Sequence, residues 1–229
     1  GLTRFQPGCS SMTPSALIVY GGYAGHEPEK TTGLVAGMLG ALGFETVQVP
    51  ELAPLADAAY LSGFDLIVLN WSVDTVTDEQ VAGLAAAVER GTGFAGWHGG
   101  QGVTLEGSGS LMFLAGGRFV AHPGGKVRYT VQMADRQHPI TAGLDDFNLH
   151  SEQYYMLVDP SNHVLATTTF GGEHLPWIAG TVMPVTWVRR WGAGRIAYCA
   201  LGHDAAEFEI PQVREMVLRG LLWAARASD

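Results

Sequence analysis

The sequence predicts an α/β domain with a mostly parallel β-sheet and helices on both of its faces. Short apolar runs alternate with helical segments through the first half of the chain, which is typical of strand–helix–strand units. The chain has 229 residues, a length that suits one such domain. Glycine contributes 31 of them, well above the usual share of about 7%, and shows no collagen-like period, so we expect it in turns.

Four short apolar runs in the first half of the chain predict buried strands. They lie at residues 16–20, 44–49, 65–70 and 93–97. Residues 27–42 and 78–90 predict helices between them, and the second helix has Thr77 as its N-terminal cap and Gly91 as its stop. Because helices connect these strands, we expect the strands to run parallel.

The second half of the chain is less regular. Its apolar runs predict further strands, some of them antiparallel, at residues 127–133, 154–158, 164–170, 185–191 and 195–201. Residues 210–227 predict the last amphipathic helix, and the Gly/Ser-rich stretch 99–110 predicts a loop. We expect residues 12–229 to form a single domain, with the polar, patternless residues 1–11 as a disordered extension upstream of a natural start near Met12.

Composition excludes several classes of protein. The formal net charge of −9 argues against general binding to nucleic acid or to an anionic membrane, since both need basic surfaces. No apolar run approaches the roughly 18 residues of a membrane span, and we find no secretion signal. The two cysteines, Cys9 and Cys199, exclude a disulfide framework, so we expect a cytoplasmic protein.

Three histidines follow predicted strands at the point where each strand ends. His26, His98 and His203 lie just beyond the runs that begin at residues 16, 93 and 195, and Asp204 is next to the third histidine. Because ligands bind beyond the carboxyl ends of the strands in an open parallel sheet, we expect these side chains to converge. The alternative is that each is a solvated loop histidine.

The sharpest local motif is Gly96-Trp97-His98-Gly99-Gly100. It has the tight turn and small flanking residues of a nucleophile elbow, but histidine stands where serine or cysteine would attack. Acyl transfer through that position is therefore excluded, and the ring is expected to bind a metal, move a proton or donate a hydrogen bond. Residues 91–96 match G-x-G-x-x-G but follow a helix and precede a strand, the reverse of the dinucleotide fingerprint, so we expect no nucleotide cofactor.

Two further candidates form a His-x-Glu pair. In an extended chain His150 and Glu152 lie on one face and can share a metal or a substrate. The alternative is a surface pair that precedes strand 154–158.

Other polar and aromatic residues are candidates for substrate binding. His122 can face the cleft, and Arg118 can bind an anion or pair with a carboxylate. Trp97 and Tyr154 can stack on sugar rings, although single aromatic side chains also form cores.

Seven segments together resemble the ThuA family, named for trehalose utilisation, within the class I glutamine amidotransferase-like superfamily. They are residues 21–27, 96–100, 116–123, 138–144, 150–155, 184–187 and 194–204. The resemblance implies a flavodoxin-like three-layer α/β/α sandwich. It also implies that His98 holds the position of the amidotransferase cysteine, so glutamine hydrolysis should be absent. The family is associated with the catabolism of disaccharides and keto-sugars, often beside sugar dehydrogenases that oxidise the C3 hydroxyl.

The resemblance and the candidate residues together predict a metal-assisted lyase, hydrolase or isomerase that acts on a 3-keto-glycoside. A ketone at C3 acidifies the proton at C2, and a divalent metal, most simply Zn²⁺, would stabilise the enolate. The expected metal ligands and proton movers are His26, His98, His150 and His203. The expected catalytic groups are His98, Glu152 as the base and Asp204 as an orienting group. The expected substrate-binding residues are Tyr23, Trp97, Arg118, His122 and Tyr154.

Two alternatives remain open at this point. One is a non-catalytic sugar-binding or regulatory module derived from an amidotransferase fold, and the other is a hydrolase or amidase that needs no keto-sugar. The expected partners are a small-molecule sugar, a sugar dehydrogenase of the same pathway and a second copy of the chain in a homodimer.

Overall fold

A computed structural model describes residues 13–107 and 109–226 of the chain. Within these residues the main feature is a nine-stranded sheet in the order β2-β1-β3-β4-β11-β10-β9-β6-β7, beside a two-stranded sheet of β5 and β8. Strands β2, β1, β3, β4 and β11 are parallel to one another, and the remaining neighbours in the large sheet are antiparallel. The predicted extension over residues 1–11 and Cys9 lie outside the described residues.

The strands follow one another along the chain with the following bounds: β1 (Ser15–Gly22), β2 (Glu45–Val49), β3 (Leu66–Ser72), β4 (Gly93–Trp97), β5 (Gly117–Ala121), β6 (Lys126–Met133), β7 (Phe147–Glu152), β8 (Tyr155–Val158), β9 (His163–Thr169), β10 (Val182–Trp191) and β11 (Gly194–Cys199). The helices are α1 (Pro28–Ala41), α2 (Ala58–Leu61), α3 (Asp78–Glu89), α4 (Gly109–Ala115) and α5 (Pro211–Ala224).

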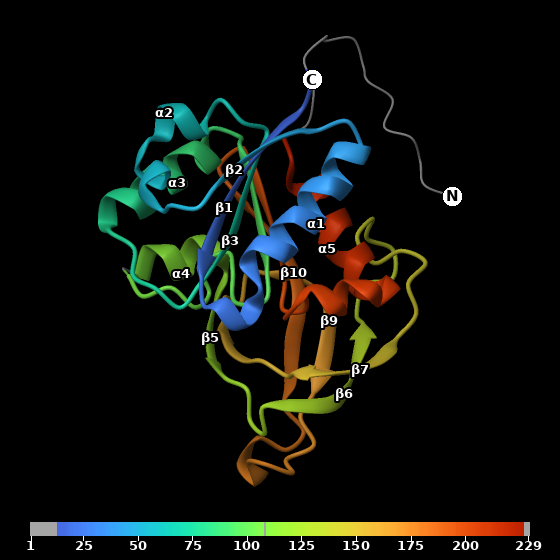
Figure 1. The fold of residues 1–229 in the computed structure, drawn as a ribbon. Helices are drawn as coiled ribbons and strands as arrows, with labels where there is room; N and C mark the ends of the chain where they lie inside the picture. The colour runs from blue at the N-terminus through green and yellow to red at the C-terminus, as the bar shows by residue number, and fades with distance from the viewer. Residues whose placement is uncertain (1–12, 108, 227–229) are drawn as a thin grey trace.

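The molecule has three layers, as the resemblance implied. Helices α1 and α5 cover one face of the parallel part of the sheet, and α2, α3 and α4 lie on the other (Figure 1). Successive residues of β1 serve the two cores, because side chains alternate along a strand. Ile18 packs with Leu39 of α1 and Leu221 of α5, whereas Leu17 packs with the residues of α3.

The start of α3 shows how the sequence sets a helix boundary. Thr77 accepts a hydrogen bond from the backbone N–H of Gln80 at 3.2 Å, and the Gln80 side chain accepts one from the N–H of Thr77 at 2.9 Å. This capping box satisfies two N–H groups that have no partner within the helix. The prediction that Thr77 caps this helix is confirmed.

Several elements differ from their prediction. The stretch 99–110 was expected to be a loop throughout, but α4 begins inside it at Gly109. Strands β5 and β7 lie where we predicted no element, although β7 carries a readable signal, since Phe147 and Leu149 are buried while Asn148 and His150 are exposed. No helix of the described residues combines the length and the apolar character that crossing a bilayer requires.

The parallel strands all present their carboxyl ends at the lower edge of the sheet in Figure 1, and strands β5, β6 and β7 lie below that edge. Strand β7 pairs with β6 over residues 147–152, which places its last residue opposite Lys126. Strands β5, β6 and β7 therefore lie beside the carboxyl ends of the parallel strands.

Replacing Thr77 with Ala should lower the free energy of unfolding by about 1 kcal/mol, because the N–H of Gln80 loses its acceptor. Urea unfolding followed by circular dichroism measures this change. The matched variant Thr77→Ser keeps a hydroxyl and should unfold at nearly the urea concentration of the wild type. Equal midpoints for Thr77→Ala and the wild type would contradict a contribution of the capping box.

Candidate metal centre

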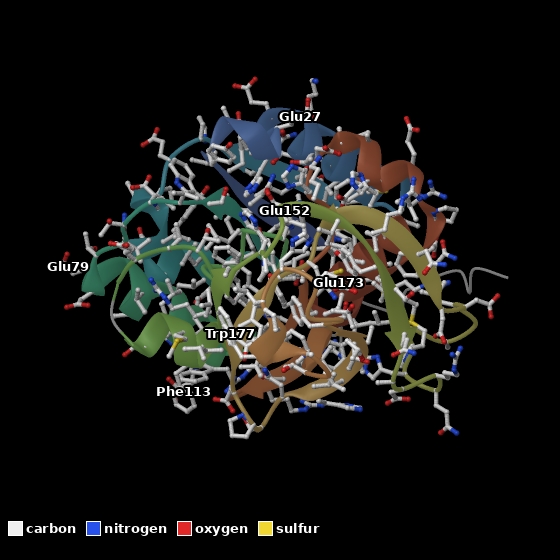
Figure 2. The ribbon with its side chains drawn as sticks, turned by 90° about the horizontal axis from the view of Figure 1, so that it is seen from below. Glu27, Glu79, Phe113, Glu152, Glu173 and Trp177 are labelled. Carbon is white, nitrogen blue, oxygen red and sulfur yellow. The ribbon has the colours of Figure 1, made fainter. Side chains whose placement is uncertain are left out.

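Four side chains from distant parts of the chain converge beyond the carboxyl ends of the strands. His26 ends the short 3-10 helix η1 (Ala24–His26) after β1, His98 follows β4 directly, His203 follows β11, and Glu152 ends β7. One ligand atom from each of the four lies within 4.8 Å of the ligand atoms of the others. Figure 2 views the molecule from below and shows Glu152 well inside the outline, whereas Glu79 lies at its rim.

The backbone at His98 makes this convergence possible. Its φ is +49°, in the left-handed region that residues other than glycine rarely adopt. The turn is tight because a Cβ on Gly100 would lie 2.5 Å from the carbonyl oxygen of Leu69, and one on Gly99 would lie 2.9 Å from the ring of His26. The elbow-like turn therefore presents the His98 ring to the loops that follow the neighbouring strands.

The imidazole of His98 has a defined orientation. Its Nδ1 lies 3.0 Å from the carbonyl oxygen of Ala200, which can only accept a hydrogen bond, so Nδ1 carries the hydrogen. In the neutral ring Nε2 then holds the lone pair. A carbonyl partner of this kind is how proteins orient histidines that bind metals.

Three ligand atoms surround one point. Nε2 of His98 lies 3.1 Å from Nδ1 of His203 and 3.1 Å from Oε2 of Glu152, and the last two atoms are 3.3 Å apart. Two ligands bound at about 2.0–2.1 Å to a tetrahedral Zn²⁺ are separated by about 3.3 Å. The spacing therefore matches the edges of a metal coordination sphere.

His26 is the fourth member of the set. Its Nδ1 lies 2.8 Å from Oγ of Ser72, and its ring centroid is 4.6 Å from that of His98 and 5.1 Å from that of His203. Burial, followed by the neighbouring His98 and His203, lowers the pKa of His26 from 6.5 to about 3. The ring is therefore neutral at physiological pH, the form in which histidine binds a metal.

Glu152 is the anionic member of the group. Burial by itself raises the pKa of its carboxyl, but hydrogen bonds with His203 and His98 outweigh it and hold that pKa well below its ordinary value. Its Oε2 faces the two histidines, whereas its Oε1 lies 3.7 Å from Nε2 of His122. One carboxylate thus joins the candidate ligands to a histidine that is 41% exposed.

The hydroxyl of Tyr154 also contacts Nε2 of His98. This hydroxyl donates to Nε2 at 2.7 Å, so the lone pair of that nitrogen faces the hydroxyl together with Nδ1 of His203 and Oε2 of Glu152. Nε2 of His98 and Oε2 of Glu152 are then two acceptors that face each other at 3.1 Å, an arrangement that a cation between them would satisfy. Burial, followed by Tyr198 and Glu152, raises the pKa of Tyr154 well above its ordinary value, so the phenol keeps its proton.

Two residues that we predicted at the centre lie apart from it. His150 shares a face of β7 with Glu152, but it lies two residues farther from the strand end and lines a surface hollow with Arg128 and Asn148. Asp204 does not orient a histidine ring: its carboxylate accepts the backbone N–H of Glu207 at 3.2 Å and an N–H of Lys126 at 3.1 Å.

The predicted substrate-binding residues divide into exposed and buried ones. Tyr23 is 55% exposed, and its ring contacts that of His26 edge-on. Trp97 is only 2% exposed and packs against Phe208 in the core, so it offers no face to a sugar. Arg118 is half-buried and donates to the carbonyl oxygen of Leu105 at 3.2 Å.

Two residues of the centre were not predicted. Ser72 ends β3 and meets His26, a position that strand-end reasoning could have found. Glu207 lies in the 3-10 helix η4 (Ala205–Glu209) and accepts hydrogen bonds from the backbone N–H groups of Gly202 and His203. No local pattern in the sequence marks Glu207, since its partners are two backbone N–H groups and the hydroxyl of Ser151, which is distant in the chain.

The family follows from a comparison of the whole chain. A family model described as ThuA, trehalose utilisation, matches residues 15–224. The chain belongs to the ThuA family. No curated protein matches the sequence.

Solved structures show the same fold. A ThuA-like protein from Bacteroides uniformis has a TM-score of 0.74 at 18% identity, with 96% of this chain and 95% of that chain covered. A ThuA-like protein from Parabacteroides merdae has a TM-score of 0.72 at 18% identity, with coverages of 95% and 93%. A β-galactosidase from Rahnella has a TM-score of 0.54 at 17% identity, and the match covers 90% of this chain but 32% of that enzyme.

The geometry predicts which histidines this ThuA-family protein needs to hold a metal. Elemental mass spectrometry of protein never exposed to chelator should find about one equivalent of Zn²⁺ or a similar ion in the wild type. His203→Ala should weaken binding by more than about 100-fold, because losing a ligand should cost more than the 10–100-fold typical of an outer partner. His150→Ala is the matched control and should keep the metal. Equal loss of metal in both variants would contradict the ligand set.

Proposed function

We propose that the chain is a metal-dependent enzyme of carbohydrate catabolism that cleaves a 3-keto-glycoside. The observation that carries the proposal is the convergence of His26, His98, Glu152 and His203, whose ligand atoms lie within 4.8 Å of one another. Three imidazoles and a carboxylate form a donor set that suits Zn²⁺ or a similar borderline ion. The family's description as trehalose utilisation supports a sugar as the substrate.

The proposed reaction is an elimination. A base removes the proton at C2, which the ketone at C3 acidifies, and the electron pair of that C–H bond forms a double bond between C1 and C2. The bond from C1 to the glycosidic oxygen breaks, and this oxygen takes up a proton to leave as an alcohol. A divalent ion bound by the histidines supplies a Lewis acid for the ketone oxygen. Later addition of water to the double bond would make the net reaction a hydrolysis, and an isomerisation is a close variant.

The residues of the centre have distinct roles in this proposal. Glu152 faces the ligands with its Oε2, and its Oε1 lies 3.7 Å from Nε2 of His122, at ion-pair distance rather than in a hydrogen bond. His122 is partly exposed and can reach a bound sugar, so the pair acts as the acid and base. Tyr154 remains protonated, so its hydroxyl is available as a hydrogen-bond donor beside the metal ligands. The exposed ring of Tyr23 offers an apolar face to the C–H surface of a sugar.

Glutamine hydrolysis is not part of the proposed activity. His98 occupies the elbow position, where no thiol or hydroxyl is available for attack. Cys199 lies at the end of β11 and is buried, and burial raises the pKa of its thiol to about 11. At pH 8 such a thiol would be about 0.1% thiolate, which makes it a poor nucleophile.

The substrate places the enzyme in a reaction sequence. A 3-keto-glycoside arises when a dehydrogenase oxidises the C3 hydroxyl of a glycoside. The proposed enzyme would act on the product of such a sugar dehydrogenase.

Activity should require both the metal and His122. A C3-oxidised disaccharide, such as the 3-keto form of trehalose, should yield a free sugar and an unsaturated product that mass spectrometry and absorbance detect. His122→Ala should lower kcat by about 10²–10⁴-fold, the usual contribution of an acid–base group, while the metal content stays at the wild-type level. His174→Ala, which changes an exposed histidine outside the centre, is the control.

Sugar-dependent thermal stabilisation without any product would contradict the enzymatic proposal. It would favour a non-catalytic sugar-binding module, for which the same cluster holds a structural ion.

Cys199 should resist alkylation in the folded protein, because its buried thiol stays protonated below its raised pKa. In a Cys9→Ser variant, iodoacetamide at pH 8 should leave the native chain unmodified over hours and label Cys199 once the chain is unfolded. Intact-mass spectrometry gives the extent of labelling. Rapid labelling of the native chain would show that a reactive thiol is present after all.

A further inference from the structure

Glu207 is a buried carboxylate that none of the proposed steps uses. Its side chain is 7% exposed, and it follows His203 closely along the chain, within the 3-10 helix η4. The nearby Lys126 pairs with Asp204 instead. A carboxylate that is taken out of water needs compensation from hydrogen bonds or from a nearby positive charge.

Hydrogen bonds to Glu207 come from two separate elements. Its Oε2 accepts the backbone N–H of Gly202 at 2.9 Å and that of His203 at 3.0 Å. Its Oε1 accepts the hydroxyl of Ser151, the residue that precedes Glu152 in β7. One side chain thus joins the loop that carries His203 to the strand that carries Glu152.

The loop after β11 depends on this arrangement. Gly202 has a φ of +93°, and a Cβ there would lie 2.9 Å from the Trp97 ring. This backbone turns two consecutive N–H groups toward a single oxygen, as in the backbone nests that bind anions. Without the acceptor, two buried N–H groups would have no partner.

The charge of Glu207 also links it to the candidate metal centre. Glu152 is one of the candidate ligands and Glu207 lies close behind them, so two carboxylates come to a centre whose remaining candidate ligands are imidazoles. The hydrogen bonds to Glu207 compensate part of that charge, and a divalent cation among the ligands would balance the two negative charges.

We propose that Glu207 is a positioning residue of the metal centre, which sets the place of His203 through the backbone and the place of Glu152 through Ser151. This inference rests on the proposed metal-dependent function. Glu207 itself does not contact the ion; it holds two of the ligands at the spacing that a divalent ion needs.

The test compares Glu207→Gln with Glu209→Gln, an exposed residue of the same 3-10 helix. Zn²⁺ affinity is measured by competition with a chromogenic chelator, and the visible spectrum of the Co²⁺-loaded protein reports the coordination geometry. We expect Glu207→Gln to weaken Zn²⁺ binding by about 10–100-fold and to change the Co²⁺ spectrum. Glu209→Gln should match the wild type in both measurements.

The variant Ser151→Ala tests the connection of Glu207 to β7 apart from its connection to the His203 loop. It also replaces Glu207→Gln as the test variant if Glu207→Gln does not fold. It keeps the contacts of Glu207 with the His203 loop and removes only the contact with β7, so its loss of Zn²⁺ affinity should be smaller.

A purely structural role would lower the Tm of the metal-free protein while the Zn²⁺ affinity and Co²⁺ spectrum stay unchanged, and that result would overturn the inference. Metal uptake by the wild type with equal affinity in Glu207→Gln overturns this inference alone. A wild type that takes up no metal overturns the proposed function as well.

Discussion

The left-handed turn at His98 is the constraint on which the rest of the centre depends. Strand β4 lies between β3 and β11 in the parallel part of the sheet, so its end is next to the ends of both neighbours. A turn that reverses at once places the ring among the loops that follow those strands. In an ordinary extended exit, the residue after β4 would continue in the strand direction, away from the Ala200 carbonyl that orients the ring.

Strand ends were the most informative part of the sequence, because a buried strand and the polar residue after it can both be read locally. Strand β4 has the bounds that its apolar run predicts, and the histidines that follow β1, β4 and β11 meet. Trp97 shows the limit of the same reasoning. It is the last residue of β4, and its side chain points into the core, although its place beside His98 in the sequence favoured a role in binding.

Tertiary contacts explain the residues that the sequence could not rank. His150 and Glu152 share a face of β7, and only the distance to the strand end decides which one reaches the histidines. That distance depends on how β6 and β7 pair beyond the sheet. Asp204 and Glu207 are both acidic, yet one caps a 3-10 helix and the other accepts two backbone N–H groups. No local pattern separates these roles, since both depend on the fold of the loop after β11.

The mixed sheet has a chemical consequence. Its parallel strands can place only the residues at or just beyond their carboxyl ends, and in this chain these residues supply three imidazoles and a serine hydroxyl. The carboxylate of the candidate ligand set, Glu152, comes from the antiparallel extension, which carries it to the edge of the parallel part. The hydrogen bond between Ser151 and Glu207 joins this extension to the loop after β11. That hydrogen bond adds a direct connection between the two halves to the continuous pairing of β11, β10, β9, β6 and β7 in the large sheet.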